Sequence, residues 1–291
     1  MVSSKMAAFY LLIVTALWGL TFPLIGESME TQDPFLYVSL RFSLAAIFVL
    51  PYFFRHLTKK TLIVGSILGL IQCGVFIPQS LGLGTVDPSR SAFLTGINVL
   101  FVPFLAPLFR MGSPTRHDVI SAIICCIGIF VLTGGNMSQL SVGDLWIIGA
   151  AVLISVSIVY IGRHAKSSMD PLMLSYSQIV MTALFSWVPT LLFSNMEFAP
   201  FLTTKALFSL SICSIFATIV AITLQAKYQK YASLQNTALI FSLEPVFAAI
   251  FTALMGGMLP TIFTFCGGAI ILSSILYLEL LRPKDLVPVV S

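Results

Sequence analysis

Two charged side chains lie deep within apolar stretches of this sequence. Glu244, which is followed by Pro245, stands in the middle of residues 233–254, and Arg41 lies inside residues 34–54. If these stretches cross a membrane, each charge costs about 2.5–3.5 kcal/mol on insertion scales. Ionisable residues at such depth usually bind a substrate, an ion or a proton. Glu244 therefore predicts a group for an ammonium or a proton, and Arg41 predicts a group for an anion.

Polar side chains from five different apolar stretches share this depth. With about 1.5 Å of rise per helical residue, they lie about 10 to 16 Å from the nearer end of their stretch. That depth is the middle of a hydrocarbon layer about 30 Å thick. Their common depth predicts one polar cavity that they line together. The five residues are Arg41, Gln72, Asn98, Gln178 and Glu244.

Each of these residues also has a purely structural explanation, and the sequence leaves both open. Glu244 could hydrogen-bond a neighbouring helix and hold a kink caused by Pro245. Arg41 could pair with Glu244 or with carbonyls and tie two helices together. The amides could join helices by hydrogen bonds worth about 0.6 kcal/mol each. Pro23, Pro78 and Pro245 are predicted hinges, because proline removes an intrahelical hydrogen bond.

Composition indicates that membrane-spanning helices hold these residues. Of 291 residues, 58% are hydrophobic and 9% are charged, whereas an ordinary globular protein has about 25% charged residues. The apolar runs are continuous rather than alternating, which predicts helices and not a β-barrel. The predicted fold is an all-α membrane protein with ten transmembrane helices, at residues 6–26, 34–54, 61–83, 89–109, 119–133, 145–162, 171–193, 206–225, 233–254 and 261–281.

The basic residues predict that both ends of the chain face the cytoplasm. With that orientation, 12 of the 15 lysines and arginines fall on the inner side, as the positive-inside rule favours. Arg90 and Lys205 fall outside, and Arg41 lies within a helix. The positive charge therefore serves topology and implies no nucleic-acid partner. The inner residues are Lys5, Arg55, Lys59, Lys60, Arg110, Arg116, Arg163, Lys166, Lys227, Lys230, Arg282 and Lys284.

The two halves of the chain, residues 1–137 and 138–291, look duplicated. An Asp-Pro pair opens a predicted helix at residues 33–34 and again 137 residues later, and SAFLTGIN at residues 91–98 is matched by TALIFSLE 146 residues later. Five helices in each half is an odd number, so the second half must be inverted, as in many transporters. The 146-residue offset also relates Gln79, predicted near the outer mouth of the cavity, to Gln225, predicted near the inner mouth.

Four short motifs carry a family resemblance over the whole chain. They are ALWG with TFP (residues 16–19 and 21–23), Asp33-Pro34 with Arg41-Phe42, SAFLTGINVLFVPFLAPLF (residues 91–109) and SLEPVFAAIF (residues 242–251). Taken in order, they resemble the ten-span EamA-type branch of the drug/metabolite transporter superfamily. The resemblance implies a central cavity lined by the first, third, fourth, sixth, eighth and ninth helices, with alternating access by rocking of helix groups. The aromatic candidates on those helices are Trp18, Phe76 and Tyr160.

The predicted function is that of a secondary active transporter. It would export amino acids or related small metabolites across a bacterial inner membrane, and Glu244 would be the coupling residue if a proton gradient drives transport. One alternative is a facilitative transporter of other solutes such as drugs or sugars. Another, of a different class, is a membrane scaffold that transports nothing.

Other classes of protein are disfavoured by missing motifs. The sequence has no HExxH, no GxSxG and no pair of intramembrane aspartates, so an enzyme is not expected, and without GxxxxGK[ST] neither is direct driving by ATP. The five cysteines lie in apolar runs and are interpreted as small core residues. No cofactor or metal is predicted. The expected partners are a small-molecule substrate and the lipid bilayer, with the chain a monomer or a homodimer.

Overall fold

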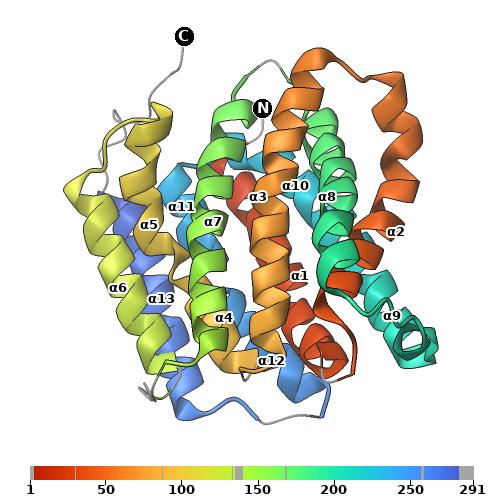
Figure 1. Ribbon diagram of the computed structural model, residues 1–291. Coiled ribbons are helices and arrows are strands. Elements are labelled where there is room, and N and C mark those ends of the chain that lie inside the picture. The colour runs from red at the N-terminus through yellow and green to blue at the C-terminus, as the bar shows by residue number, and fades with distance from the viewer. Residues whose placement is uncertain are drawn as a thin grey trace.

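The computed structural model describes residues 3–29, 31–86, 88–132, 134, 140–167, 169–256 and 259–281, without the side chains of Glu27 and Ser89. Every regular element in these ranges is a helix (Figure 1). The predicted boundary between the halves, at residues 137 and 138, and the basic residues Arg282 and Lys284 lie outside the described residues. The all-α class is confirmed.

Nine stretches of the described chain are long and apolar enough to cross a membrane. The expected fifth span, α6, has 17 residues and is not among the nine, so the count of ten is not confirmed. The helices are α1 (Ser4–Met29), α2 (Pro34–Arg55), α3 (Lys59–Leu83), α4 (Pro88–Gly96), α5 (Asn98–Leu105), α6 (Arg116–Leu132), α7 (Val142–Ala165), α8 (Pro171–Phe193), α9 (Thr204–Ile212), α10 (Ala221–Tyr228), α11 (Leu234–Phe241), α12 (Glu244–Leu254) and α13 (Ile262–Leu281).

The two Asp-Pro pairs each start a helix. The side chain of Asp33 accepts a hydrogen bond from the backbone N–H of Leu36 at the start of α2, and Asp170 accepts one from Leu172 at the start of α8. Proline follows each cap at a position where its missing N–H costs nothing. The repeated dipeptide is therefore a helix-start signal.

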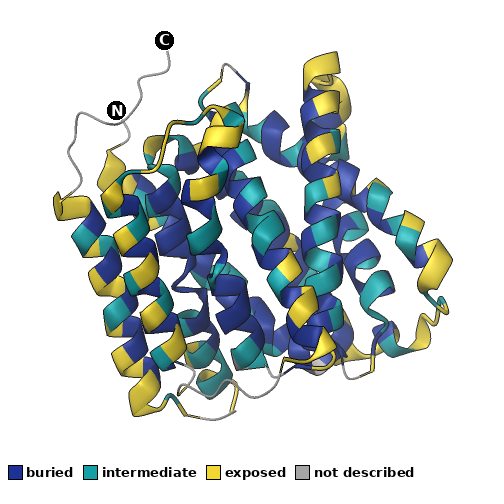
Figure 2. Cartoon of the chain, turned by 60° about the vertical axis from the view of Figure 1, so that its left-hand side comes forward, coloured by how far each residue is buried: buried dark blue, intermediate teal, exposed yellow. Residues whose placement is uncertain are grey.

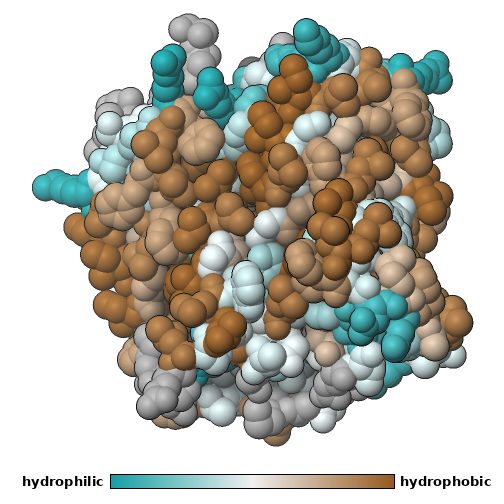
Figure 3. All heavy atoms as spheres, viewed as in Figure 1, coloured by the Kyte–Doolittle hydropathy of each residue, from teal (hydrophilic) through white to brown (hydrophobic). Residues whose placement is uncertain are grey.

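The outer surface of the bundle is apolar. Exposed residues cover the outward faces of the helices and buried ones the inward faces (Figure 2). Figure 3 shows hydrophobic residues over most of the middle of one face, with hydrophilic residues along its upper edge and in a patch at its lower right. A surface of this kind is suited to lipid. Large exposed apolar side chains include Phe48, Leu70, Leu192 and Phe265.

Some helix pairs pack so closely that even one added methyl group would not fit between them. A Cβ atom added at Gly69 of α3 would lie 2.6 Å from Cβ of Met181 in α8, so only glycine allows this approach. Helix α8 also contacts α2, where Nε1 of Trp187 donates to Oγ of Ser43 at 2.9 Å. Helices α6 and α13 form another close pair, at the left of Figure 1.

Three expected spans are not single α-helices. The fourth breaks between α4 and α5, and the ninth breaks between α11 and α12. The eighth contains a π-helical segment, Cys213–Val220, between α9 and α10. Pro245 is the second residue of α12 and lies in its first turn, so the ninth span is not one kinked helix. By contrast, α1 and α3 continue through Pro23 and Pro78.

Candidate functional site

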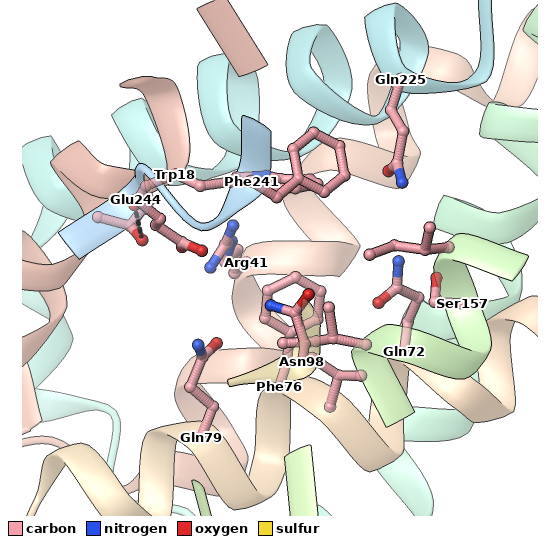
Figure 4. A pocket seen from close by; sticks show the side chains of 14 residues that line it. Trp18, Arg41, Gln72, Phe76, Gln79, Asn98, Ser157, Gln225, Phe241 and Glu244 are labelled. Carbon is pink, nitrogen blue, oxygen red and sulfur yellow. Dashed lines mark hydrogen bonds between the residues drawn. The ribbon is translucent and has the colours of Figure 1, made fainter. Parts of the chain in front are cut away.

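Eight of the ten residues predicted for the site line one cavity. The empty space between its lining residues is about 570 Å³, part of which is open to solvent, and the cavity lies between helices of both halves of the chain. Its walls come from α1, α3, α5, α7, α10, α11 and α12, which are the spans that the resemblance implies, and from α2 in addition. The eight are Trp18, Arg41, Gln72, Phe76, Gln79, Asn98, Gln225 and Glu244 (Figure 4).

Arg41 supplies a buried cation to this cavity. Its side chain is 2% exposed, and its Nε donates to Oγ1 of Thr218 at 2.9 Å. The guanidinium carbon lies 4.8 Å from the centroid of the Phe76 ring, a distance at which the face of the ring attracts a cation. Nη2 has no hydrogen-bond partner among the described residues. The Nη2 amino group of a fixed guanidinium, with its two N–H donors, therefore remains for a ligand.

Glu244 lies on the same cavity but does not neutralise this cation. Within the described residues, no ion pair joins it to Arg41, and no hydrogen bond reaches its carboxyl group. Figure 4 shows both side chains directed toward the same space. Glu244 as a whole residue is 7% exposed. One structural explanation for Arg41, a pair with Glu244, is thus not observed among the described residues, although the bond to Thr218 does join Arg41 to another helical segment.

Asn98 opens α5 as Glu244 opens α12. Its Nδ2 donates to the carbonyl oxygen of Thr95 at 2.8 Å, and its Oδ1 has no partner among the described residues. The carbonyl oxygen of Asn98 accepts a hydrogen bond from Oγ of Ser155 in α7 at 2.8 Å. Asn98 therefore both joins two helices and offers a free acceptor to the cavity.

The side-chain amides of Gln79 and Gln225, the residues predicted near the two mouths of the cavity, lie on opposite sides of the space drawn in Figure 4. Nε2 of Gln79 donates to Oγ1 of Thr95 at 3.3 Å. Nε2 of Gln225 donates to Oε1 of Gln229 at 3.0 Å, and Nε2 of Gln229 donates to the carbonyl oxygen of Ile158 at 2.6 Å. Oε1 of Gln225 has no partner among the described residues.

Aromatic rings form the apolar part of the wall. The indole of Trp18 packs edge-on against Phe241, with ring centroids 4.9 Å apart, and its Nε1 donates to the carbonyl oxygen of Ala217 at 3.0 Å. Phe76 lies against Arg41. The cavity thus has an aromatic surface beside its cation and its amides, which suits a solute with both polar and apolar parts.

Two predicted residues are not among those that line this cavity. Tyr160 packs its ring against His164 and Phe109, with centroids 4.3 and 6.1 Å away. Gln178 is completely buried in α8, and neither end of its amide has a partner among the described residues. Depth along a helix fixed the height of these side chains but not the direction in which they point.

Six lining residues were not singled out from the sequence. Spacing offers a signal for most of them: Thr21 lies three residues after Trp18, and Val75 belongs to the helical stripe of Gln72, Phe76 and Gln79. Residues of α7 repeat the same spacing. Phe241 has no such signal, because its position depends on the break after α11. The six are Thr21, Val75, Ile154, Ser157, Ile158 and Phe241.

Comparison with known proteins points to membrane transport. The model of the EamA-like transporter family matches residues 5–134 and again residues 141–280. A protein of Archaeoglobus fulgidus described as an uncharacterized transporter is 27% identical over 270 residues, covering 93% of this chain and 84% of that protein. A solved structure described only as a crystal structure of a protein aligns with a TM-score of 0.77 at 17% identity, covering 95% of this chain and 97% of that one. At that identity the structural likeness concerns the fold alone.

Proposed function

The chain belongs to the EamA-like transporter family, and we propose that it exports amino acids or related small metabolites by secondary active transport. Membership makes the protein an integral, multi-pass membrane transporter and not an enzyme. The substrate, the direction, the energy coupling and a bacterial inner membrane are parts of the proposal.

The main support for the proposal is a set of polar atoms at the cavity that have no hydrogen-bond partner among the described residues. Arg41 offers a donor at Nη2, while Asn98 and Gln225 offer acceptors at Oδ1 and Oε1. Buried polar atoms are usually hydrogen-bonded, so such atoms around a cavity suggest that a ligand completes them. A solute with a carboxylate and an ammonium group has the complementary donors and acceptors. The rings of Trp18 and Phe241 would face its apolar part.

Glu244 is the proposed coupling residue. Its carboxyl group borders the cavity without a cation or a hydrogen-bond donor in contact among the described residues. A carboxylate in such a place is costly to bury alone and gains from a bound ammonium or a bound proton. Competition between the substrate and a proton for this one group would couple their movements in opposite directions.

Alternating access would depend on an inverted-repeat relation between the two halves of the chain. We propose ten spans in two inverted repeats, residues 1–137 and 138–291, with both ends of the chain in the cytoplasm. The double match of the family model and the equivalent Asp-Pro starts of α2 and α8 support the repeat. Rocking of helix groups about the cavity would then expose it to each side in turn.

Uptake by proteoliposomes tests the proposal. The purified protein is assayed with a panel of labelled amino acids and small metabolites, with and without an imposed pH gradient, beside Glu244→Gln and Arg41→Gln. We expect saturable uptake of a carboxylate-bearing solute that the gradient stimulates. Glu244→Gln should remove the stimulation, and Arg41→Gln should raise KM by about tenfold or more, the effect of losing one charged hydrogen bond.

The matched control is Gln178→Leu, which changes a buried amide outside the cavity and should keep both properties. Uptake that no gradient stimulates and that Glu244→Gln retains would instead favour a facilitative transporter. Uptake of drugs or sugars but of no amino acid would contradict the proposed substrate. No uptake of any solute by a folded protein would favour the scaffold.

A further inference from the structure

The π-helical segment Cys213–Val220 stands between two ordinary helices in the eighth span. π-helical turns are rare and frequently occur at functional sites. The segment contains neither glycine nor proline, so it does not arise from a helix-breaking residue. A contact made by its side chains or carbonyls is the remaining explanation.

Two successive residues of this segment hold two side chains of the cavity. Oγ1 of Thr218 accepts the hydrogen bond from Nε of Arg41 at 2.9 Å, and the carbonyl oxygen of Ala217 accepts that from Nε1 of Trp18 at 3.0 Å. Oγ of Ser214 donates to the backbone carbonyl of Arg41 at 2.9 Å. One π-helical segment of the second half thus contacts α1 and α2 of the first.

The hydroxyl group of Thr218 depends on the π-helical register for its own orientation. It donates to the carbonyl oxygen of Cys213, five residues earlier, at 2.9 Å. Threonine in an α-helix bonds a carbonyl three or four residues earlier. In the π-helical segment the hydroxyl group of Thr218 donates its proton to the carbonyl oxygen of Cys213, and a lone pair of the same hydroxyl oxygen accepts the hydrogen bond from Nε of Arg41.

We infer that the π-helical segment is a positioning element of the transport site, with Thr218 the residue that positions the guanidinium of Arg41. Thr218 does not itself line the cavity. Because Thr218 accepts the hydrogen bond from Nε of Arg41, it fixes the orientation of the guanidinium and the position of the unpartnered Nη2. The position of Nη2 in turn determines where an anionic group of the solute binds. This last step rests on the proposed function, whereas the positioning itself does not.

Hydrogen exchange tests the positioning without any substrate. The sequence has seven arginines, so protein labelled with ¹⁵N-arginine gives few Nε–H signals, and the signal lost in Arg41→Lys belongs to Arg41. We compare the wild type with Thr218→Val, which removes the hydroxyl group, and Thr218→Ser, which keeps it. The matched control is Thr182→Val, because the hydroxyl group of Thr182 bonds only its own helix, at the carbonyl oxygen of Gln178.

We expect the Nε–H of Arg41 to exchange about tenfold faster in Thr218→Val, the effect of losing one hydrogen bond of a charged group. Thr218→Ser and Thr182→Val should both exchange like the wild type. Equal exchange in the wild type and in Thr218→Val would overturn the inference. An equal acceleration in Thr182→Val would also overturn it, because a general loosening would then explain the effect.

Transport gives a second measurement, with L-leucine and its amide as the probes. Thr218→Val should raise KM for L-leucine several-fold while leaving kcat and the KM of the amide nearly unchanged, because only the carboxylate uses Arg41. An equal change in both KM values would contradict a role in anion placement. If the wild type moves neither probe, the proposed function fails for this solute class, and the exchange measurement still decides the positioning.

Discussion

The segments expected as the fourth and ninth spans, Arg90–Phe109 and Leu234–Leu254, each contain a break, and they differ there in one ionisable group. Asn98 begins α5, and Glu244, 146 residues later, begins α12. Both residues line the cavity. Oγ of Ser242 lies 3.3 Å from the carbonyl oxygen of Gly96 and 2.9 Å from that of Ala238 in α11, and its one proton is shared between them, so the two breaks are in contact. The amide of Asn98 donates to the carbonyl oxygen of Thr95 at the end of α4, across the break. The carboxyl group of Glu244 has no such tie among the described residues.

This difference suggests a division of labour between otherwise similar halves. A half-helix that begins at the cavity directs its free N–H groups and the positive end of its dipole there. In α12 a carboxyl group stands at that end, whereas in α5 a neutral amide does. The first half thus offers the cation Arg41 and a neutral amide to the cavity, and the second half offers the acid. A zwitterion would meet opposite charges on the two sides.

Asn98→Asp removes the difference between a neutral amide at position 98 and a carboxyl group at position 244. Of the substitutions considered, it should have the largest effect on transport. It places a second carboxyl group on the cavity, where each buried charge costs about 2.5–3.5 kcal/mol. We expect uptake of carboxylate solutes by proteoliposomes to fall by about tenfold or more, because the new acid competes with the substrate for Arg41. Stability in detergent should fall as well, measured as the free energy of unfolding in mixed micelles.

The double variant Asn98→Asp with Glu244→Gln separates charge from position. It restores one carboxyl group but moves it to the first half. If the asymmetry matters, this variant stays inactive although its net charge equals that of the wild type. Recovery of gradient-stimulated uptake would show that either half can carry the acid.

Pro245→Ala tests whether proline makes the break, and its effect should be intermediate. The residue equivalent to Pro245 in the fourth span is Val99, and that span breaks without a proline. Pro245 lies in the first turn of α12, where a proline fits the helix. We therefore expect the free energy of unfolding to change by no more than about 1 kcal/mol and the uptake rate to stay near that of the wild type. A large loss of uptake with unchanged stability would restore the hinge predicted from the sequence.

Most of the helices and of the polar lining residues could be predicted from the sequence. Polar residues within apolar runs are rare, because each costs free energy in a membrane, and so they stand out in the sequence. Arg41, Gln72 and Glu244 stand out in this way and do meet at one cavity. Depth alone could not predict that Gln178 points elsewhere, because rise along a helix gives height and not direction. The direction depends on contacts such as that between Gly69 and Met181, which fix how α3 and α8 face each other.

The irregular segments were not predictable for a different reason. The residues Cys213–Val220 contain no glycine or proline, and the break before Asn98 has no proline beside it. At these departures from the α-helix the chain makes contacts between distant segments, such as that of Thr218 with Arg41. Short-range sequence patterns carry no information about such contacts.

Ser242→Ala removes the contact between the two breaks and should have the smallest effect. Interhelical hydrogen bonds in membrane proteins are worth about 0.6 kcal/mol, so we expect a loss of that size in the free energy of unfolding in mixed micelles. The control is Ser186→Ala, whose hydroxyl group bonds only the carbonyl oxygen of Ala183 in its own helix. If both variants lose the same amount, the bond to Gly96 contributes nothing, and the breaks stay in place by the packing of α4 against α12 alone. A larger loss in Ser242→Ala would mean that the two broken spans stabilise each other at the cavity.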